Sequence, residues 1–229
     1  MLPYRLLTTD DANPKMKKNQ ALGFITAGLT LAPARQLDPN LNLCPAHSPG
    51  CAQACLFWSG RGSMSRTRNA RLQRTAHWRD HPEWFLKSLR ADLEALIINA
   101  TDVGMKPACR LNVTSDIAWE QFRIPDEFPT IQFYDYTKRR DRKVKTDNYH
   151  LTFSRSELNH RLVVPTLQLG QNVSVVFRNE LPKEYAGYPV IDGDLHDCRW
   201  LDPTPTIVGL RAKGPRGQVD TTGFVVSPS

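Results

Sequence analysis

The sequence contains no run of about 20 consecutive apolar residues, the length that a membrane-spanning helix requires. Its first residues lack the basic segment and apolar core of a secretory signal peptide. We therefore expect a cytoplasmic chain with no membrane partner. No phosphate-binding glycine loop and no nucleophile elbow is present either, which counts against an ordinary kinase, dehydrogenase or hydrolase.

Cysteine is scarce and unevenly placed. Of five cysteines, Cys44, Cys51 and Cys55 fall within twelve residues, whereas Cys109 and Cys198 stand alone. An odd, clustered set does not match the disulfide framework of a small secreted protein. Clustered cysteines in a chain without a signal peptide more often bind a metal.

The spacing Cys44-x6-Cys51-x3-Cys55 is compatible with two kinds of metal centre. Three thiolates on one loop can bind three corners of an iron–sulfur cluster and leave one iron accessible. They can also bind zinc together with one histidine, for which His47, His77 and His81 are the candidates by proximity in sequence.

At 229 residues the chain suits one α/β domain, residues 21–229, preceded by a polar N-terminal arm, residues 1–20. Its formal net charge of +7 favours an anionic partner, namely nucleic acid or a nucleotide.

Short apolar runs alternate with longer connections along the chain, which predicts an α/β fold with a mainly parallel sheet, as a partial or open (β/α) barrel. Prolines between Pro33 and Pro49 place the cysteine cluster on a loop without a regular helix. One helix is predicted from Ser65, and a second is capped by Asp80 and buries every third or fourth apolar residue. The predicted strands are 22–26, 108–113, 131–136, 149–153, 173–177, 189–191 and 207–210.

Polar residues follow several of these strands, where active sites of parallel α/β folds lie. We expect Asp116, Lys138, Asp192 and Asp194 to act as catalytic residues, and Thr114 and Ser154 to line a cofactor. Ser154 and Glu157 also have the spacing of a capping box, which predicts a helix start.

Arginine is concentrated between residues 61 and 79, flanked by two tryptophans. Guanidinium groups suit phosphate and aromatic rings suit stacked bases, although a charge run is also typical of a solvated helix face. The candidate nucleic-acid contacts are Arg66, Arg68, Arg71 and Arg74, with Arg139 and Arg140 in a second basic segment.

With these motifs the chain resembles the bacteriophage gene product 88 family over nearly its whole length. The resemblance is carried by 44–62, Arg-Leu-Asn-Val-Thr-Ser-Asp at 110–116, 133–138, Tyr-His-Leu-Thr-Phe-Ser at 149–154, 190–194 and 222–226. If the chain is encoded by a phage, its compartment is the host cytoplasm.

The segment Ser48-Pro-Gly-Cys51, flanked by Cys44 and Cys55, is also similar to the cluster loop of phage radical-SAM proteins related to spore photoproduct lyase. Those proteins share a strand that ends in Thr-Lys-Arg, as at 137–139. This resemblance implies a partial barrel in which the three cysteines hold a [4Fe–4S] cluster that reductively cleaves S-adenosylmethionine. We expect such an enzyme to act on nucleic acid or a nucleotide-like substrate.

Two other functions stay open. The guanine transglycosylases of phage DNA modification combine a structural zinc with two catalytic aspartates. Here Cys44, Cys51, Cys55 and His77 would hold zinc, with Asp116 and either Asp192 or Asp194 as the acids. A zinc-stabilised nucleic-acid-binding protein without catalysis is the third.

Overall fold

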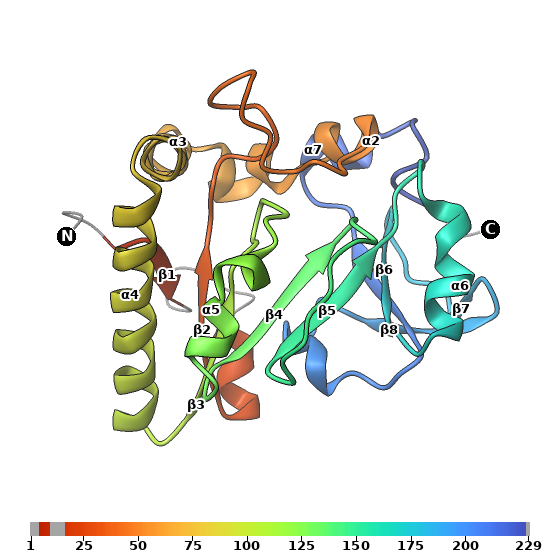
Figure 1. Ribbon diagram of the computed structural model, residues 1–229. Coiled ribbons are helices and arrows are strands. Elements are labelled where there is room, and N and C mark those ends of the chain that lie inside the picture. Colours follow the sequence, from red (N-terminus) through yellow and green to blue (C-terminus); the bar gives the residue numbers. More distant parts are fainter. Residues whose placement is uncertain (1–4, 10–16, 228–229) are drawn as a thin grey trace.

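Strands from most of the chain join into one twisted, open sheet (Figure 1). The computed structural model describes residues 5–9 and 17–227, and within them nine strands follow the order β1-β2-β3-β4-β5-β6-β9-β8-β7. Neighbours from β2 to β8 run parallel, while β1 and β7 pair antiparallel at the two edges. The strands are β1 Leu7–Thr9, β2 Phe24–Leu29, β3 Lys106–Arg110, β4 Gln132–Thr137, β5 Tyr149–Ser154, β6 Val173–Phe177, β7 Glu184–Tyr185, β8 Tyr188–Asp192 and β9 Ile207–Arg211.

The expected α/β class and mainly parallel sheet are confirmed. The sheet is open and not closed into a barrel, because its edge strands pair with β2 and β8 and not with each other. The α-helices are α2 Pro49–Gln53, α3 Ser65–Asp80, α4 Pro82–Asp102, α5 Ile124–Glu127, α6 Val163–Gln168 and α7 Gly214–Gln218. Short 3-10 helices are η2 Lys18–Leu22, η3 Leu56–Trp58, η4 Gly60–Ser63, η5 Trp119–Phe122, η6 His160–Leu162 and η7 Arg199–Leu201. No helix in the described part of the chain is long and apolar enough to span a membrane.

The long helix α4 covers one half of the sheet, and its sequence explains why. Pro82 occupies the first turn, where a missing N–H costs nothing. Apolar side chains then recur every three or four residues and form a face that is 0–2% exposed, made of Phe85, Leu89, Leu93 and Leu96. The N-cap of α4 is His81, one residue after the predicted Asp80. Asp80 instead ends α3 and forms an ion pair with Arg79.

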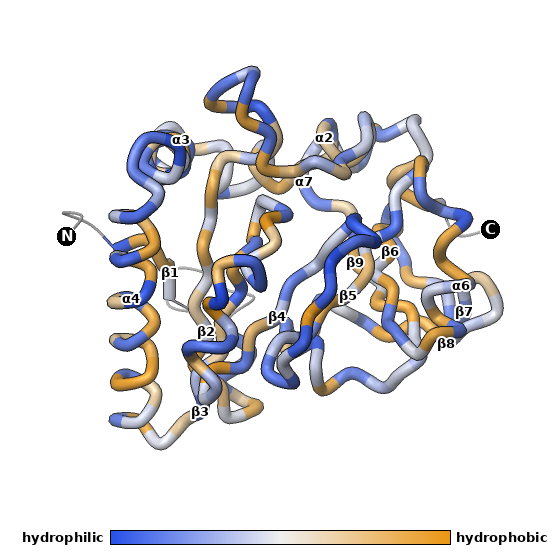
Figure 2. The backbone as a smooth tube through the Cα atoms, viewed as in Figure 1, coloured by the Kyte–Doolittle hydropathy of each residue, from blue (hydrophilic) through white to orange (hydrophobic). Residues whose placement is uncertain are grey.

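A second core lies under α6, where Val163 and Leu167 pack with Phe153 of β5 and Val173 of β6. Strand β5 contributes to both cores, with Tyr149 in the first and Phe153 in the second. The connection from β4 to β5, residues 138–148, contains no helix. Figure 2 shows this connection and α3 as mostly hydrophilic, whereas α4 alternates hydrophobic and hydrophilic turns.

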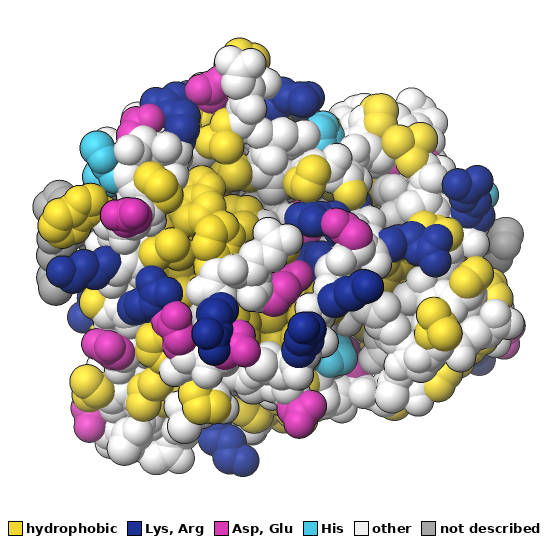
Figure 3. All heavy atoms as spheres, viewed as in Figure 1, with side chains coloured by type: hydrophobic (Ala, Val, Ile, Leu, Met, Phe, Trp, Pro, Cys, Tyr) yellow, Lys and Arg dark blue, Asp and Glu magenta, His cyan; other side chains and the backbone are white. Residues whose placement is uncertain are grey.

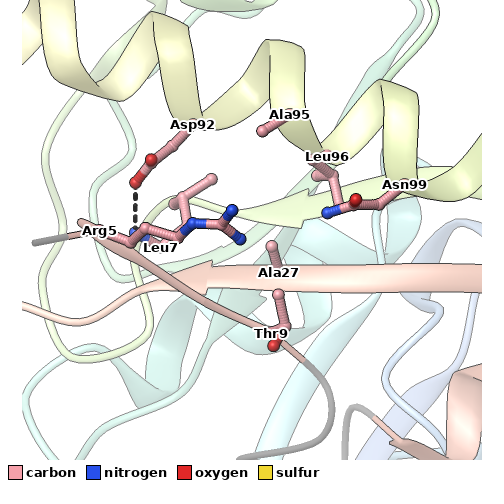
Figure 4. A pocket seen from close by; sticks show the side chains of 8 residues that line it. All are labelled: Arg5, Leu7, Thr9, Ala27, Asp92, Ala95, Leu96 and Asn99. Atoms are coloured by element: carbon pink, nitrogen blue, oxygen red, sulfur yellow. Dashed lines mark hydrogen bonds between the residues drawn. The ribbon is translucent and has the colours of Figure 1, made fainter.

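Part of the expected N-terminal arm belongs to the sheet. Leu7 pairs with Leu29 in β2, and Leu6 is fully buried. The backbone N–H groups of Leu6 and Leu7 donate to Asp92 Oδ2 of α4 at 2.6 and 3.0 Å, and Figure 4 shows the contact between Leu7 and Asp92. The pocket beside this contact has a volume of about 10 Å³, roughly one water molecule, so it serves packing and not a ligand. Residues 1–4 and 10–16 of the arm lie outside the described residues.

Candidate functional site

The cysteine cluster is built around the short helix α2. Ser48 is its N-cap residue and accepts a hydrogen bond from the Cys51 backbone N–H at 3.2 Å, and Pro49 occupies the first turn. Cys44 lies on the preceding loop, and Cys55 follows the helix at the start of η3. The prediction that proline excludes a helix here is wrong at Pro49, because proline is tolerated at the first helical position.

Glu157 holds α2 against the loop that follows β5. Its carboxylate accepts hydrogen bonds from Ser48 Oγ and from the Gly50 backbone N–H, both at 2.7 Å. The C-terminal segment packs on the same helix. A Cβ atom at Gly50 would lie 2.1 Å from Thr222 Oγ1 and 2.4 Å from the Phe224 Cβ, so only glycine fits.

The ammonium group of Lys138 lies among the thiols. Lys138 directly follows β4, and its Nζ donates to Ser154 Oγ at 2.9 Å and hydrogen-bonds the Cys51 side chain. Burial lowers the pKa of Lys138, but the nearby Cys51, Asp116 and Cys44 raise it, and the net shift is upward. The site therefore keeps this lysine charged.

The three thiols share one neighbourhood, because each cysteine affects another's ionisation. Burial, with smaller contributions from Cys55 and Cys51, raises the pKa of Cys44 to about 12. Burial also raises the pKa of Cys55, with Cys51 adding to this rise while Lys138 and Arg71 oppose it. Thiols with raised pKa values hold their protons at neutral pH until a cation such as a metal ion displaces them.

All five cysteines are free thiols, and two thiols of the cluster have protein partners. Cys44 Sγ donates to the Thr114 carbonyl oxygen at 3.5 Å, and the Cys51 side chain interacts with the charged Lys138. Within residues 5–9 and 17–227, no group of three or more His, Cys, Asp or Glu side chains is arranged to hold a metal ion. The donor set itself fits a thiophilic metal. Metal binding therefore stays a prediction, and it requires these thiols to exchange their partners.

Asp116 braces the end of β4. Its two oxygens accept from Thr137 Oγ1 at 2.8 Å and from the Lys138 backbone N–H at 3.0 Å. Arg142 Nη1 lies 3.5 Å from Asp116 Oδ1. With both oxygens engaged and only 7% of the residue exposed, Asp116 holds Lys138 in place, which is a positioning role.

Thr114 and Ser154, the expected cofactor contacts, both lie at the cysteine site. The Thr114 hydroxyl donates to the Leu31 carbonyl oxygen at 2.6 Å, and the Ser154 hydroxyl accepts from Lys138. The carboxyl ends of β3, β4 and β5 thus bring together the polar residues that follow them, as the parallel-sheet argument predicts.

Arg71 of α3 turns toward the thiols. Its guanidinium carbon lies 5.5 Å from the centre of the Phe57 ring, and its charge lowers the pKa of Cys55. Burial lowers the pKa of Arg71 itself. Its buried Nε and Nη1 have no hydrogen-bond partner among the residues that the structure describes. This arginine belongs to the thiol site and not to an outward-facing helix surface.

The remaining candidate arginines divide by exposure. Arg66 and Arg68 are exposed on α3, and Arg74 is partly buried. Arg139 is paired with Asp141 through two hydrogen bonds of 3.0 and 2.6 Å. Arg140 is exposed in the connection after β4.

Three further candidates lie outside the thiol site and contact other residues: Asp192, Asp194 and His77. Arg211 Nη1 approaches Asp192 at 2.9 Å and Asp194 at 3.4 Å, and Lys213 also pairs with Asp194. In the sheet order β8 is separated from β4 by β5, β6 and β9, which explains why these carboxylates do not join Asp116. His77 lies in the last turn of α3 with its ring 6.1 Å from that of His81.

Sequence reasoning missed two contributors to the site. The capping-box prediction for Glu157 is wrong, because the next helical turn, η6, begins only at His160 and the carboxylate binds α2. The other is the buried Arg142, which donates to Glu120 at 3.0 and 2.7 Å and to Tyr149 Oη at 2.6 Å. Neither contact has a local sequence signal, since the partners are far apart in the chain.

Comparisons with known proteins agree with the motifs named above. No curated protein and no solved structure matches the chain. The family model described as "Gene product 88" matches residues 5–228, which is nearly the entire sequence. The chain therefore belongs to the gene product 88 family.

Proposed function

We propose that this chain is a metalloenzyme in which Cys44, Cys51 and Cys55 hold an iron–sulfur cluster, and that it acts on nucleic acid or a nucleotide-like substrate. One observation carries the proposal. Lys138, which follows β4 at the carboxyl ends of the parallel strands, interacts electrostatically with all three thiols. Active sites of parallel α/β folds lie at this end of the sheet.

The charges around the thiols support a thiolate-bound group. Lys138 and Arg71 both act electrostatically on Cys55, and Lys138 also hydrogen-bonds Cys51. A cluster or zinc ion bound by three thiolates carries net negative charge, which two neighbouring cations offset. The unpartnered Nε and Nη1 of Arg71 are donors without another acceptor among the described residues, and N–H groups directed at sulfur stabilise such centres.

A [4Fe–4S] cluster with one open iron would supply an electron to S-adenosylmethionine, in line with the radical-SAM resemblance. The chain's own residues would prepare that site. Asp116 fixes the Lys138 backbone through its N–H, and Lys138 then directs its ammonium at Cys51 and Ser154. Glu157 keeps α2, and with it Cys51, against the sheet.

Exposed arginines on α3 are the proposed contacts for a nucleic-acid backbone. Arg66 and Arg68 are exposed on the first turns of the helix, next to the cysteine segment. Phosphate contacts of this kind release counterions, so retention on DNA should fall as the salt concentration rises. Retention that does not change with salt would contradict this part of the proposal.

The decisive experiment is anaerobic purification followed by metal, acid-labile sulfide and visible absorption measurements. The wild-type protein should contain iron and sulfide and absorb broadly in the visible range. Each of the substitutions Cys44→Ser, Cys51→Ser and Cys55→Ser should remove nearly all of the metal, because the ligands act as a unit.

Cys198→Ala is the matched control, because Cys198 is a fully buried thiol outside the cluster. This variant should keep its full metal content. A colourless wild-type protein with stoichiometric zinc would reject the iron–sulfur enzyme in favour of a zinc protein. Metal-free protein after anaerobic purification, or metal that survives all three cysteine substitutions, would reject the cluster itself.

A further inference from the structure

A pocket of about 140 Å³ opens beside β4 and β5, and none of its described lining residues is a cysteine. Its floor is formed by Thr137, Leu151 and Phe153. Thr137 pairs with Phe153, and Leu151 pairs with Asp135 two residues earlier, so these side chains lie on one face of the sheet. Phe153 also packs with α6, which places the pocket on the helix-bearing face.

The pocket exists because the connection between β4 and β5 contains no helix to cover the strands. Residues 138–148 instead run past the sheet as a basic segment. In Figure 3, several Lys and Arg side chains, interspersed with Asp and Glu, lie over this part of the molecule, in front of β4 and β5. The cavity is therefore bordered by positive charge on one side and by the apolar floor on the other.

The lining is rich in hydrogen-bond donors. Among the residues that the structure describes, three guanidinium groups, two hydroxyls and one amide border the pocket and no carboxylate does. These polar residues are Arg139, Arg140, Arg142, Thr137, Thr166 and Gln171. Such a set of donors without a lining acid matches an oxyanion ligand, and guanidinium groups suit phosphate in particular.

The three arginines differ in how much binding capacity they keep. Arg142 is held by Glu120 and Tyr149 with its side chain 1% exposed, so it is rigid; its Nη1 makes no hydrogen bond among the described residues but lies 3.5 Å from Asp116 Oδ1. Arg139 is occupied by Asp141. Arg140 has no hydrogen bond or ion pair with any residue in the described part of the chain, so its whole guanidinium is available.

We propose that this pocket binds a phosphate group, either free or carried by a nucleotide. A cavity of about 150 Å³ holds one benzene-sized molecule, so this pocket accepts a phosphate with a few attached atoms, and the rest of a nucleotide would extend outward. Arg140 and Arg142 would contact the phosphate oxygens, while Leu151 and Leu169 would contact the adjoining carbons. The inference is independent of the metal proposal, because it requires none of the cysteines.

The test is titration calorimetry in a phosphate-free buffer with four probes: inorganic phosphate, adenosine 5′-monophosphate, adenosine, and a 5′-phosphorylated oligonucleotide. Phosphate-bearing probes should bind and adenosine should not. Equal affinity for phosphate and the mononucleotide identifies free phosphate as a sufficient ligand, and tighter binding of the mononucleotide or oligonucleotide identifies a nucleotide. Arg140→Gln should weaken binding about tenfold or more, as expected for losing one charge-assisted contact.

Two variants separate the pocket from general surface charge. Arg35→Gln removes the same charge from an exposed site elsewhere and should leave affinity unchanged. Leu169→Trp keeps every charge but fills the pocket from a residue that is 83% exposed, so folding is preserved and binding should be lost. Equal losses in Arg35→Gln and Arg140→Gln, unchanged binding in Leu169→Trp, or no phosphate binding by the wild type at millimolar concentration would each overturn the proposal.

Discussion

The buried Asp135 makes the stability of this protein depend on pH in a direction opposite to that of most carboxylates. Asp135 lies in β4 and is fully buried. It accepts hydrogen bonds from the Asn112 N–H and Nδ2 at 2.7 and 2.9 Å and from Tyr149 Oη at 2.5 Å. Burial raises its pKa from 3.8 to about 6, although Arg142 and these donors oppose the rise.

The direction of this pH dependence follows from the number of protons bound by the folded and unfolded chains. Between about pH 4 and pH 6 the folded chain holds a proton on Asp135 that the unfolded chain has released. The stabilisation is therefore fully present below about pH 4 and is lost as the pH rises through 6. A shift of roughly two pKa units corresponds to about 3 kcal/mol of unfolding free energy.

Asp135→Asn removes this titration and keeps the shape of the side chain. The changed hydrogen bonds of the variant shift the unfolding free energy by an amount that does not depend on pH. The informative quantity is therefore how the difference in unfolding free energy between variant and wild type changes with pH. From pH 4 to pH 7.5 the unfolding free energy of Asp135→Asn should rise by about 3 kcal/mol relative to the wild type. Urea denaturation followed by tryptophan fluorescence, at equal metal content, measures it.

Asp220→Asn is the control for this series. Burial raises the pKa of Asp220, but hydrogen bonds from the Val225 N–H and from Thr222 lower it more, and the net shift is downward. Its contribution is fully present above about pH 4 and is lost only at lower pH, so its difference curve should stay nearly flat from pH 4 to pH 7.5. A flat curve for Asp135→Asn would refute the burial argument, and a reversed one would mean that Arg142 keeps Asp135 ionised.

Two further predictions concern the attachment of α2. Gly50→Ala should displace the C-terminal segment, because the new Cβ would lie 2.1 Å from Thr222 Oγ1, and faster proteolysis of that segment would report the displacement. In the control Gly217→Ala the new Cβ would meet nothing closer than 3.5 Å, so this variant should behave as the wild type. Glu157→Gln removes the negative charge that accepts two hydrogen bonds, so it should lower the unfolding free energy by about 1–3 kcal/mol and speed thiol labelling at Cys51. The control Glu180→Gln, at an exposed position, should change neither quantity. Unchanged labelling in Glu157→Gln would show that α2 is held by other contacts.

Local sequence patterns predicted most of the secondary structure correctly. The strand expected at 173–177 is β6, and the expected α4 face is the one that packs on the sheet. Short-range rules decide such elements, since apolar periodicity and proline positions act within a few residues. The failures were at places where long-range contacts decide, as at Leu7, whose pairing with β2 turns part of a polar segment into an edge strand.

The expected site was predicted in part. Asp116 and Lys138 meet because β3 and β4 are neighbours in the sheet, and neighbouring parallel strands end side by side. Asp192 and Asp194 follow a strand in the same way, but β8 lies beyond β9 and far from β4. Strand order is a property of the whole chain, and no local pattern reveals it.

The sequence alone determined the two long helices and most strands, the family, and the gathering of Cys44, Cys51 and Cys55 on one short segment. Tertiary structure alone decided which charges face those thiols: Lys138 arrives from β4 and Arg71 turns inward from α3. The physical reason is the distance along the chain over which each kind of interaction acts. Helix caps and apolar periods act over a few residues, whereas contacts between distant side chains depend on how the sheet orders its strands and which surfaces become buried.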